Sequence, residues 1–163
     1  MKVKELKKLF AKAAGKYVSK EEEKYFAEEI VETEIRKSAT WKWGNGILED
    51  IKTWSEKKKE VKKTIDLPGF TQYNFNGLGP SLKIREIHDD LESKAKKNGI
   101  AMVSILNSGG MHKMHLWTQG LAKRGLFAFG AWNGGPDAVC QIVPRGGSGI
   151  AVRDEAKKAS FRT

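Results

Sequence analysis

Apolar residues recur at helical spacing in the first part of the chain and in short runs after it. From residue 3 to residue 14 they follow an i, i+3, i+4 pattern, which predicts an amphipathic helix. A second helix is predicted after Ser19, because Ser-Lys-Glu-Glu has the form of a capping box with Glu22 at its third position. A third, weaker helix is expected around residues 47–54. The second helix is expected to bury Phe26, Ala27, Ile30, Val31 and Ile35.

The pattern changes near Leu67-Pro68-Gly69, where short strands are expected to begin. Alternating positions predict a strand at 70–75, and an amphipathic pattern predicts a helix at 81–98 that ends at Asn98-Gly99. Further elements are predicted as a buried strand at 100–106, a helix at 111–124, a second buried strand at 126–132 and one frayed helix at 150–163. This order predicts an α/β protein with an N-terminal three-helix lobe (1–66), a partial α/β layer with a small, mainly parallel sheet (67–147), and a basic tail (148–163).

Length and composition favour a soluble protein with one modest core. The chain has 163 residues, of which 39% are apolar, and its longest apolar runs, such as Ile100–Leu106, are far too short to span a membrane. No signal-peptide pattern opens the chain. A single cysteine, Cys140, excludes an internal disulfide framework and an all-cysteine metal cluster. We therefore expect a reducing compartment, most simply the cytoplasm, and no membrane partner.

The net charge of +10 is spread along the chain. Its densest run, Lys57–Lys63, includes Glu60 and directly precedes a turn. No nucleic-acid-binding motif accompanies the run, so a solvated face or linker is favoured over a nucleic-acid surface. A basic chain can also attract anionic substrates or nucleotides.

Two polar, glycine-rich segments are the main candidates for a ligand site. Asn107–His112 follows one predicted buried strand and opens a helix, and Asn133–Pro136 follows the next. Because ligands bind at the carboxyl ends of strands in open α/β sheets, these segments would meet at a ligand-binding edge. Two ordinary turns would give the same pattern. Gly77-x-Gly79 is interpreted as a glycine turn, because the third glycine of a dinucleotide fingerprint is absent.

Among the three histidines, His112 lies nearest this loop and is the candidate proton donor or acceptor. His88 is expected on the surface and His115 in the core. A metal site is not expected, because no carboxylate or further imidazole lies near His112 and His115 in the sequence. Cys140 is interpreted as a small core residue.

Several segments together resemble the N-terminal half of the type-2 malate/L-lactate dehydrogenase family, which includes ureidoglycolate and sulfolactate dehydrogenases. The matching segments, in the family's order, are Ala27–Arg36, Asn76–Gly79, Lys94–Val103, Asn107-Ser108, Leu121–Leu126, Trp132-Asn133 and Val143–Gly147.

The resemblance implies an NAD- or NADP-dependent reductase of small 2-oxo acids, a non-Rossmann nucleotide-binding sheet and a homo-oligomer. The family's loop histidine aligns with about Gly110, and His112 lies two residues further on. For such a reductase, His112 is the candidate proton donor, and Asn107, Ser108 and Asn133 are the candidates for orienting the ligand or cofactor. The sequence also departs from the family. The segment Lys37–Lys42 has no histidine where the family carries a catalytic one, and family members are about twice as long as this chain.

Three hypotheses stand at this stage. The chain is a truncated, weakly active or inactive dehydrogenase, a non-catalytic remnant that serves binding or assembly, or, least favoured, a basic nucleic-acid-binding module. The missing histidine favours the remnant over full activity.

Overall fold

The computed structural model describes the chain apart from residues 1, 37–42, 56–58, 110–113, 134–137, 144–149 and 155–163. Within the elements, the side chains of residues 36, 43–46, 114–115 and 131 onward are also outside the description. The chain divides into two compact units, Met1–His112 and Lys113–Thr163. None of the described helices is long and apolar enough to cross a membrane.

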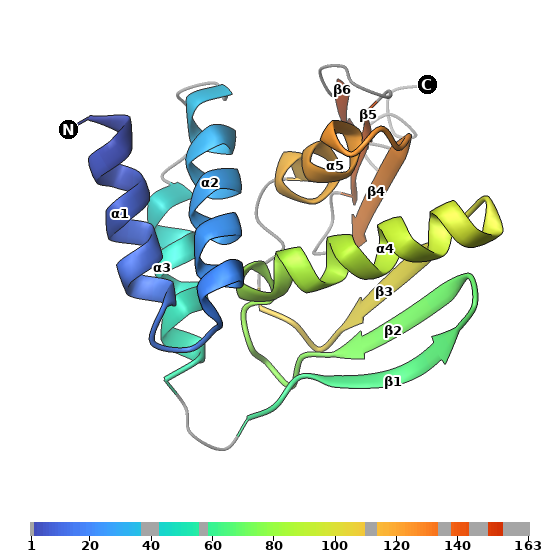
Figure 1. The fold of residues 1–163 in the computed structure, drawn as a ribbon, viewed down its shortest axis with the longest axis horizontal. Helices are drawn as coiled ribbons and strands as arrows, with labels where there is room; N and C mark the ends of the chain where they lie inside the picture. The colour runs from blue at the N-terminus through green and yellow to red at the C-terminus, as the bar shows by residue number, and fades with distance from the viewer. Residues whose placement is uncertain are drawn as a thin grey trace, which may run out of the picture. The chain divides into compact units, whose positions relative to one another are not determined.

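Three helices open the first unit: α1 (Val3–Ala14), α2 (Lys20–Arg36) and α3 (Trp43–Thr53) (Figure 1). Helices α1 and α2 pack together, and the rings of Phe10 and Phe26 meet edge to face with their centroids 6.4 Å apart. The fully buried side chains of the unit include Phe26, Ile30, Val31, Ile47, Phe75, Leu78, Leu82, Ile84 and Ile87. The core therefore joins the helical lobe to the elements that follow it.

A three-stranded sheet, here called sheet A, completes this unit. Its strands are β1 (Lys62–Leu67), β2 (Phe70–Asn74) and β3 (Met102–Leu106), in the order β1-β2-β3. Strands β1 and β2 pair antiparallel, whereas β2 and β3 pair parallel through a crossover made of the short 3-10 helix η1 (Pro80–Lys83) and α4 (Ile84–Asn98). Helix α4 runs along one face of sheet A (Figure 1). It ends at Gly99, whose φ of 82° is the left-handed geometry of a glycine cap.

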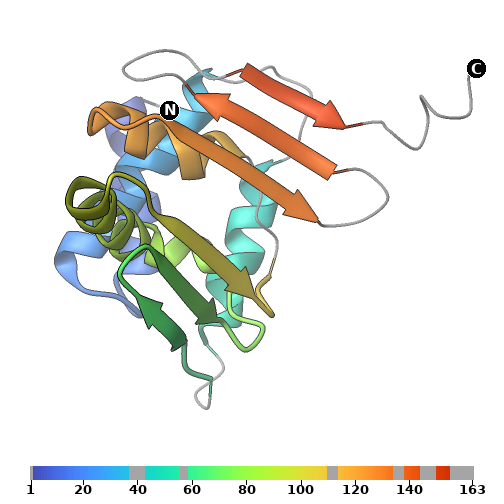
Figure 2. The ribbon, with the colours of Figure 1, turned by 90° about the vertical axis from the view of Figure 1, so that its right-hand side faces the viewer.

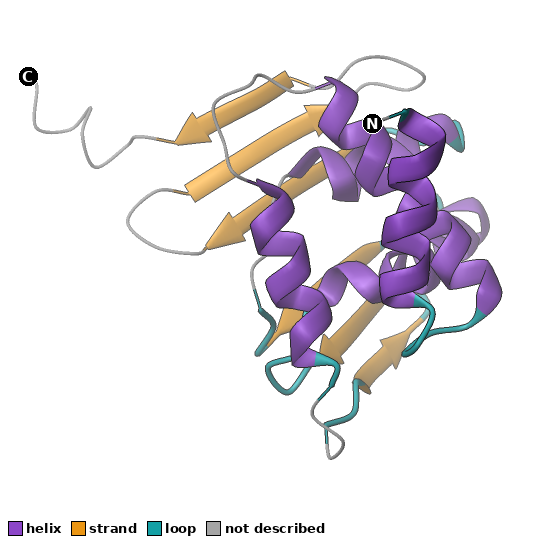
Figure 3. Cartoon of the chain, turned by 90° about the vertical axis from the view of Figure 1, so that its left-hand side faces the viewer, coloured by secondary structure: helices purple, strands orange, loops and turns teal. Residues whose placement is uncertain are grey.

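The second unit contains α5 (Met114–Lys123), β4 (Ala128–Asn133), β5 (Ala138–Val143) and β6 (Ile150–Asp154). Its strands form a wholly antiparallel sheet in the order β4-β5-β6 (Figure 2). All residues from Leu116 to Ala122 are buried. Figure 3 distinguishes the strands of both sheets from the helices.

The predicted α/β fold class, with a helical lobe followed by a small sheet, is confirmed. The expectation of mainly parallel pairing is met only by β2 and β3; every other described pair is antiparallel. The predicted frayed helix at 150–163 is wrong for its first part, because β6 pairs with β5 there. Strand β1 begins at Lys62, inside the segment predicted as helical lobe. The division at 66/67 and 147/148 remains a prediction.

Three burial predictions for apolar segments are wrong. Ile35, in the last turn of α2, is 61% exposed. The run 100–106 was expected to be buried, yet Ile100 is 76% and Met102 61% exposed. This run forms an edge strand with α4 on one face only, so its alternate residues have no cover among the described parts of the unit. In the second unit, Phe127 and Phe129 are likewise exposed around the start of β4.

His88 was expected on the surface but is fully buried. Its Nδ1 lies 2.8 Å from the hydroxyl oxygen of Tyr25, and the two rings meet edge to face. The tyrosine comes from α2, which packs on α4, so the burial of His88 follows from a contact 63 residues away in sequence. A hydrogen-bond partner of this kind offsets the free-energy cost of burying an imidazole.

Candidate functional site

Two loops follow the parallel strands at the carboxyl edge of sheet A. Residues 75–79 follow β2 and residues 107–109 follow β3. The loops are joined by backbone hydrogen bonds: Gly77 N donates to Asn107 O at 2.6 Å, and Gly109 N donates to Leu78 O at 3.1 Å. Asn76, Gly77 and Asn107 have positive φ values of 51°, 85° and 47°. These are residue types that adopt left-handed geometry readily, so the sequence encodes the sharp exits of both strands.

The predicted ligand residues Asn107 and Ser108 lie at this edge. Asn107 is exposed, and its Nδ2 donates to Asn74 Oδ1 at 3.3 Å. Ser108 is half-buried, and its hydroxyl donates to Gly109 O at 3.0 Å. Asn133 ends β4 in the second unit, and its side chain lies outside the described residues, as does the whole of His112. The roles assigned to these four residues stay predictions.

Asp50 of α3 fills the space beneath the two loops. It is 3% exposed, and its Oδ2 accepts a 2.8 Å hydrogen bond from the hydroxyl of Ser81. A Cβ atom added to Gly79 would lie 2.3 Å from Asp50 Cγ, and one added to Gly109 would lie 3.0 Å from Asp50 Oδ1. The carboxylate of Asp50 therefore leaves no room for a side chain at Gly79 and little room for one at Gly109.

The C-terminal end of α3 holds Gly79 by both of its backbone polar groups. Gly79 N donates to Thr53 Oγ1 at 2.7 Å, and Trp54 Nε1 donates to Gly79 O at 2.8 Å. The hydroxyl of Thr53 in turn donates to Asp50 O at 2.6 Å. We call Asp50, Thr53, Trp54, Gly79 and Gly109 the loop anchor. Sequence reasoning missed the anchor, because α3 was interpreted only as a weak helix and its polar residues carry no motif.

A nicotinamide nucleotide needs a concave cradle with available donors, and the described residues do not supply one at this edge. The amide of Asn107 is engaged by Asn74, and the hydroxyl of Ser108 is turned onto its own loop. The glycines that would let a pyrophosphate approach the backbone are instead packed against Asp50. Among the described residues, no group of three or more His, Cys, Asp or Glu side chains is placed to hold a metal ion.

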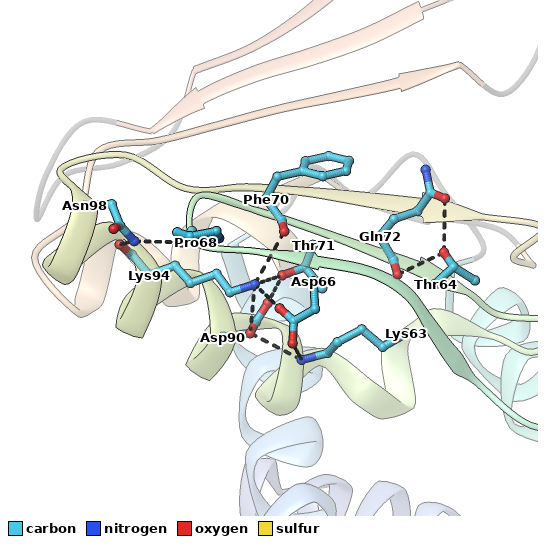
Figure 4. A network of polar contacts seen from close by, with 10 residues as sticks. All are labelled: Lys63, Thr64, Asp66, Pro68, Phe70, Thr71, Gln72, Asp90, Lys94 and Asn98. Carbon is cyan, nitrogen blue, oxygen red and sulfur yellow. Dashed lines mark hydrogen bonds and ion pairs between the residues drawn. The ribbon is translucent and has the colours of Figure 1, made fainter.

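A second polar cluster links sheet A to α4 (Figure 4). The ammonium of Lys94 contacts Asp66 and the Thr71 hydroxyl, and it lies 3.4 Å from Phe70 O. The hydroxyl of Thr71 donates to Asp90, which also lies 3.5 Å from the ammonium of Lys63. The hydrogen bond from Lys94 lowers the pKa of Asp66. The charges are mutually paired, so this cluster positions α4 on the sheet.

Tyr73 lies beside this cluster and is 2% exposed. Its hydroxyl is buried without a hydrogen-bond partner, and Lys63 Nζ lies 5.4 Å from the ring centroid. Burial raises the pKa of Tyr73 to about 12, and the charge of Asp90 adds to the effect. The phenol therefore stays protonated and does not act as a base at neutral pH.

Glu22 joins α2 to the beginning of α4. It is 4% exposed, and its Oε1 accepts hydrogen bonds from Arg85 N at 3.0 Å and Glu86 N at 3.4 Å. Ser19 Oγ accepts from Glu22 N at 3.3 Å, as the capping box predicts, but the carboxylate caps α4 instead of returning to Ser19. Burial raises the pKa of Glu22 to about 7 against the opposing effect of the two backbone donors.

This carboxylate borders a polar cleft of about 240 Å³. The cleft is lined by Val18, Ser19, Glu22, Lys83, Arg85, Glu86 and Asp89. Lys83 pairs with Glu86 at 2.8 Å, and Arg85 lies 3.6 Å from Asp89. Each of the two cations of the cleft is thus paired with a carboxylate, and Glu22 is the one further carboxylate in the lining.

Comparison with known proteins identifies the fold. No model of a known protein family matches the sequence, and no curated protein is significantly similar to it in sequence. The structure is similar to malate dehydrogenase from Pyrococcus horikoshii OT3, with a TM-score of 0.71 and 14% identity over 93% of this chain and 49% of that one. It is also similar to malate dehydrogenase from Entamoeba histolytica, with a TM-score of 0.71 and 13% identity over 94% of this chain and 48% of the other.

A third match is sulfolactate dehydrogenase from Methanocaldococcus jannaschii, with a TM-score of 0.66 and 16% identity over 94% of this chain and 50% of that one. At these identities the likeness establishes the fold. The resemblance noted in the sequence is thus confirmed at the level of the fold, and the chain spans about half the length of the solved structures it matches.

Proposed function

We propose that the chain is a dehydrogenase-type oxidoreductase that has weak or no turnover on its own. The proposed reaction is the NADH- or NADPH-dependent reduction of a small 2-oxo acid to the 2-hydroxy acid. The observation that carries the proposal is the fold, which three solved structures named as malate or sulfolactate dehydrogenases share over 93–94% of this chain. The cytoplasm is the proposed location.

Weak activity is proposed for two reasons. Lys37–Lys42 offers no imidazole at the position where the resembling family carries one, and loss of a positioned general acid costs about a hundred- to ten-thousand-fold in rate. The loop anchor fills the space behind Gly79 and Gly109, which leaves less room there for a cofactor to be oriented for hydride transfer. His112 is the proposed residual proton donor, with Asn107, Ser108 and Asn133 as proposed ligand contacts.

The test measures oxidation of NADH and of NADPH by the purified chain with pyruvate and oxaloacetate as 2-oxo acids. We expect turnover at or near background, and any residual rate is expected to fall further in His112→Ala. Robust turnover by the chain would refute the weak-activity proposal. A residual rate unchanged in His112→Ala would remove His112 from the mechanism.

A nucleotide titration followed by two-dimensional NMR tests cofactor binding without turnover. If the proposed contacts are right, we expect chemical-shift changes confined to residues 107–110 and 133.

A non-catalytic binding or assembly protein is the second candidate. The observation that favours it is the set of large apolar side chains exposed on sheet A, which are of no use to a small-acid reductase that works as a monomer. Absence of both turnover and nucleotide binding, together with stable association, would favour this candidate. For the third hypothesis, nucleic-acid binding, the structure adds no support: Lys20, Lys52, Lys83 and Lys96 each pair with a carboxylate of the chain itself.

A further inference from the structure

Glu22 has one carboxylate oxygen to which no described residue donates a hydrogen bond. The side chain is 4% exposed, and Arg85 N and Glu86 N both donate to its Oε1. Oε2 is not among the fully enclosed atoms without a partner, so it is the oxygen that faces the cleft which Glu22 lines. Figure 1 shows the first turns of α2 beside the beginning of α4, where this cleft lies. The cleft therefore contains a buried acceptor that is still available.

The other charges that face Glu22 are matched. Lys83 of η1 pairs with Glu86 at 2.8 Å, and Arg85 of α4 lies 3.6 Å from Asp89. Among the described residues, Glu22 is the one charge of the lining that has no ion-pair partner. A buried charge without a counter-charge is costly, and burial accordingly raises the pKa of Glu22 to about 7.

The capping of α4 does not by itself require this carboxylate. A neutral serine, threonine or asparagine side chain supplies the oxygen that a helix start needs, without the cost of burying a charge. Glu22 uses Oε1 for this purpose, and its second oxygen remains beside the cleft. A buried acceptor in that position is typical of a group that binds a ligand with N–H donors.

The cleft suits a small ligand with a primary ammonium group. Its volume of about 240 Å³ is below the roughly 300–1,000 Å³ of pockets that hold drug-sized molecules. A guanidinium group pairs best with both oxygens of a carboxylate, and Oε1 is already engaged by α4. An ammonium group is a compact point charge, which a single oxygen can accept. Around this oxygen, Glu86 and Asp89 add further acceptors, and the half-buried Val18 adds an apolar wall for a short alkyl chain.

We propose that the cleft between the beginning of α2 and the beginning of α4 is a binding site for a small primary amine, whose ammonium group donates to Glu22 Oε2. The bound cation supplies the counter-charge that no described residue places beside this carboxylate. Binding does not depend on the reductase activity proposed above, so its test needs no turnover.

Binding of the amine is expected to depend on pH, because the cation requires the ionised carboxylate. With a pKa of about 7, about one-tenth of Glu22 is ionised at pH 6 and about nine-tenths at pH 8. The apparent Kd rises as the competent fraction falls, so we expect it to be about tenfold lower at pH 8 than at pH 6.

The experiment titrates the full chain with n-propylammonium chloride at pH 6 and at pH 8, at constant ionic strength. Two-dimensional NMR follows the amide signals of Arg85 and Glu86, because these amides donate to the carboxylate itself. We expect saturable shifts with a Kd on the order of 1 mM at pH 8, as suits a ligand of few atoms. Tetramethylammonium has the same charge but no N–H donor, so we expect it to cause no saturable shift.

Glu22→Gln tests the site, and Glu49→Gln is the matched control. Glutamine keeps an oxygen for the amides of α4 but has no charge, so we expect binding at pH 8 to weaken by at least about tenfold. Glu49 lies on α3 and pairs with Lys52 on the surface, so its variant is expected to bind like the parent chain.

Four results would each overturn the proposal: no saturable shift, equal binding of tetramethylammonium, equal Kd values at pH 6 and pH 8, or undiminished binding to Glu22→Gln. Should Glu22→Gln unfold, the two pH values and the two cations decide the question in the parent chain.

A free amine and the side chain of a lysine carry the same ammonium group. The end-blocked peptide Gly-Lys-Gly is therefore titrated in parallel. We expect n-propylammonium to bind more tightly than the peptide, because the cleft is small. Tighter binding of the peptide would overturn the assignment to a free amine and place the ammonium group on a protein partner.

Discussion

The carboxyl of Glu22 makes the stability of the first unit depend on pH in a direction opposite to that of most carboxylates. Its pKa is about 7 in the folded chain, because burial outweighs the two backbone donors of α4, whereas an unfolded chain has the ordinary value of 4.5. Between these values the folded chain retains a proton that the unfolded chain has lost. The free energy of unfolding therefore falls as pH rises from about 4.5 to about 7.

The size of this effect follows from the shift. A rise from 4.5 to about 7 corresponds to about 3 kcal/mol if no solvent screens the charge. Glu22 borders a cleft that opens to water, so the fully buried value overestimates the penalty. We expect about 1–2 kcal/mol of the unfolding free energy to disappear between about pH 5 and about pH 8 on account of this one group.

The substitution that isolates the effect is Glu22→Gln. The amide oxygen of glutamine can still accept from Arg85 N and Glu86 N, but it carries no titrating charge. We expect the variant to match the parent chain near pH 5 and to be about 1–2 kcal/mol more stable near pH 8. Urea unfolding at the two pH values measures this, with the protein concentration held fixed because association also stabilises the folded state.

Glu49→Gln is the control for this series. Glu49 lies on α3 with its side chain 67% exposed and pairs only with Lys52 on the surface. Such a pair contributes little, so the pH dependence of this variant is expected to follow that of the parent chain. Parallel pH profiles for the parent and Glu22→Gln would refute the reasoning, because they would show that Glu22 ionises in the folded chain as readily as in the unfolded one.

Three further substitutions test the packing. Gly79→Ala is expected to cost about 2–3 kcal/mol of unfolding free energy, because its Cβ would lie 2.3 Å from Asp50 Cγ; combined with Asp50→Ala the two losses are expected to be less than additive, and strict additivity in urea unfolding would contradict the contact. Gly99→Ala meets no atom within 4 Å but has a φ of 82°, so thermal unfolding is expected to show a loss of about 1 kcal/mol from backbone strain alone. Tyr73→Phe removes a buried hydroxyl that has no partner and is expected to be neutral or to stabilise by up to about 1 kcal/mol, whereas a loss above that would reveal a hydrogen bond to the phenol.

Much of the local structure was predictable because it depends on neighbours in the sequence. The i, i+3, i+4 pattern places α1 at Val3–Ala14, as the structure has it, and Asn98-Gly99 ends α4 with the expected left-handed cap. The turn around Gly77 was predicted from the same short-range chemistry.

The candidate site was predictable only in its position. Chain order and strand type place Asn107 at the carboxyl edge of a parallel pair, and the structure has it there. The strand that was expected to bring Asn133 to the same edge, β4, belongs instead to a separate antiparallel sheet. The residue that packs beneath the loops, Asp50, comes from a helix 29 residues before Gly79 and 59 before Gly109. The residue pattern within α3 does not show which distant loop the helix contacts, so the loop anchor was not predictable. For the same reason the sequence did not predict that the carboxylate of Glu22 caps α4 and not its own helix.

The apolar run from Ile100 to Leu106 shows where periodicity fails for a physical reason. A continuous apolar run predicts a strand covered on both faces, and among the described elements of the first unit only α4 covers a face of β3. The apolar pattern of a strand indicates that its side chains favour burial, but it does not indicate what covers them. The apolar pattern of β3 records this tendency, and the exposed fraction of Met102 records only the cover that the described residues provide.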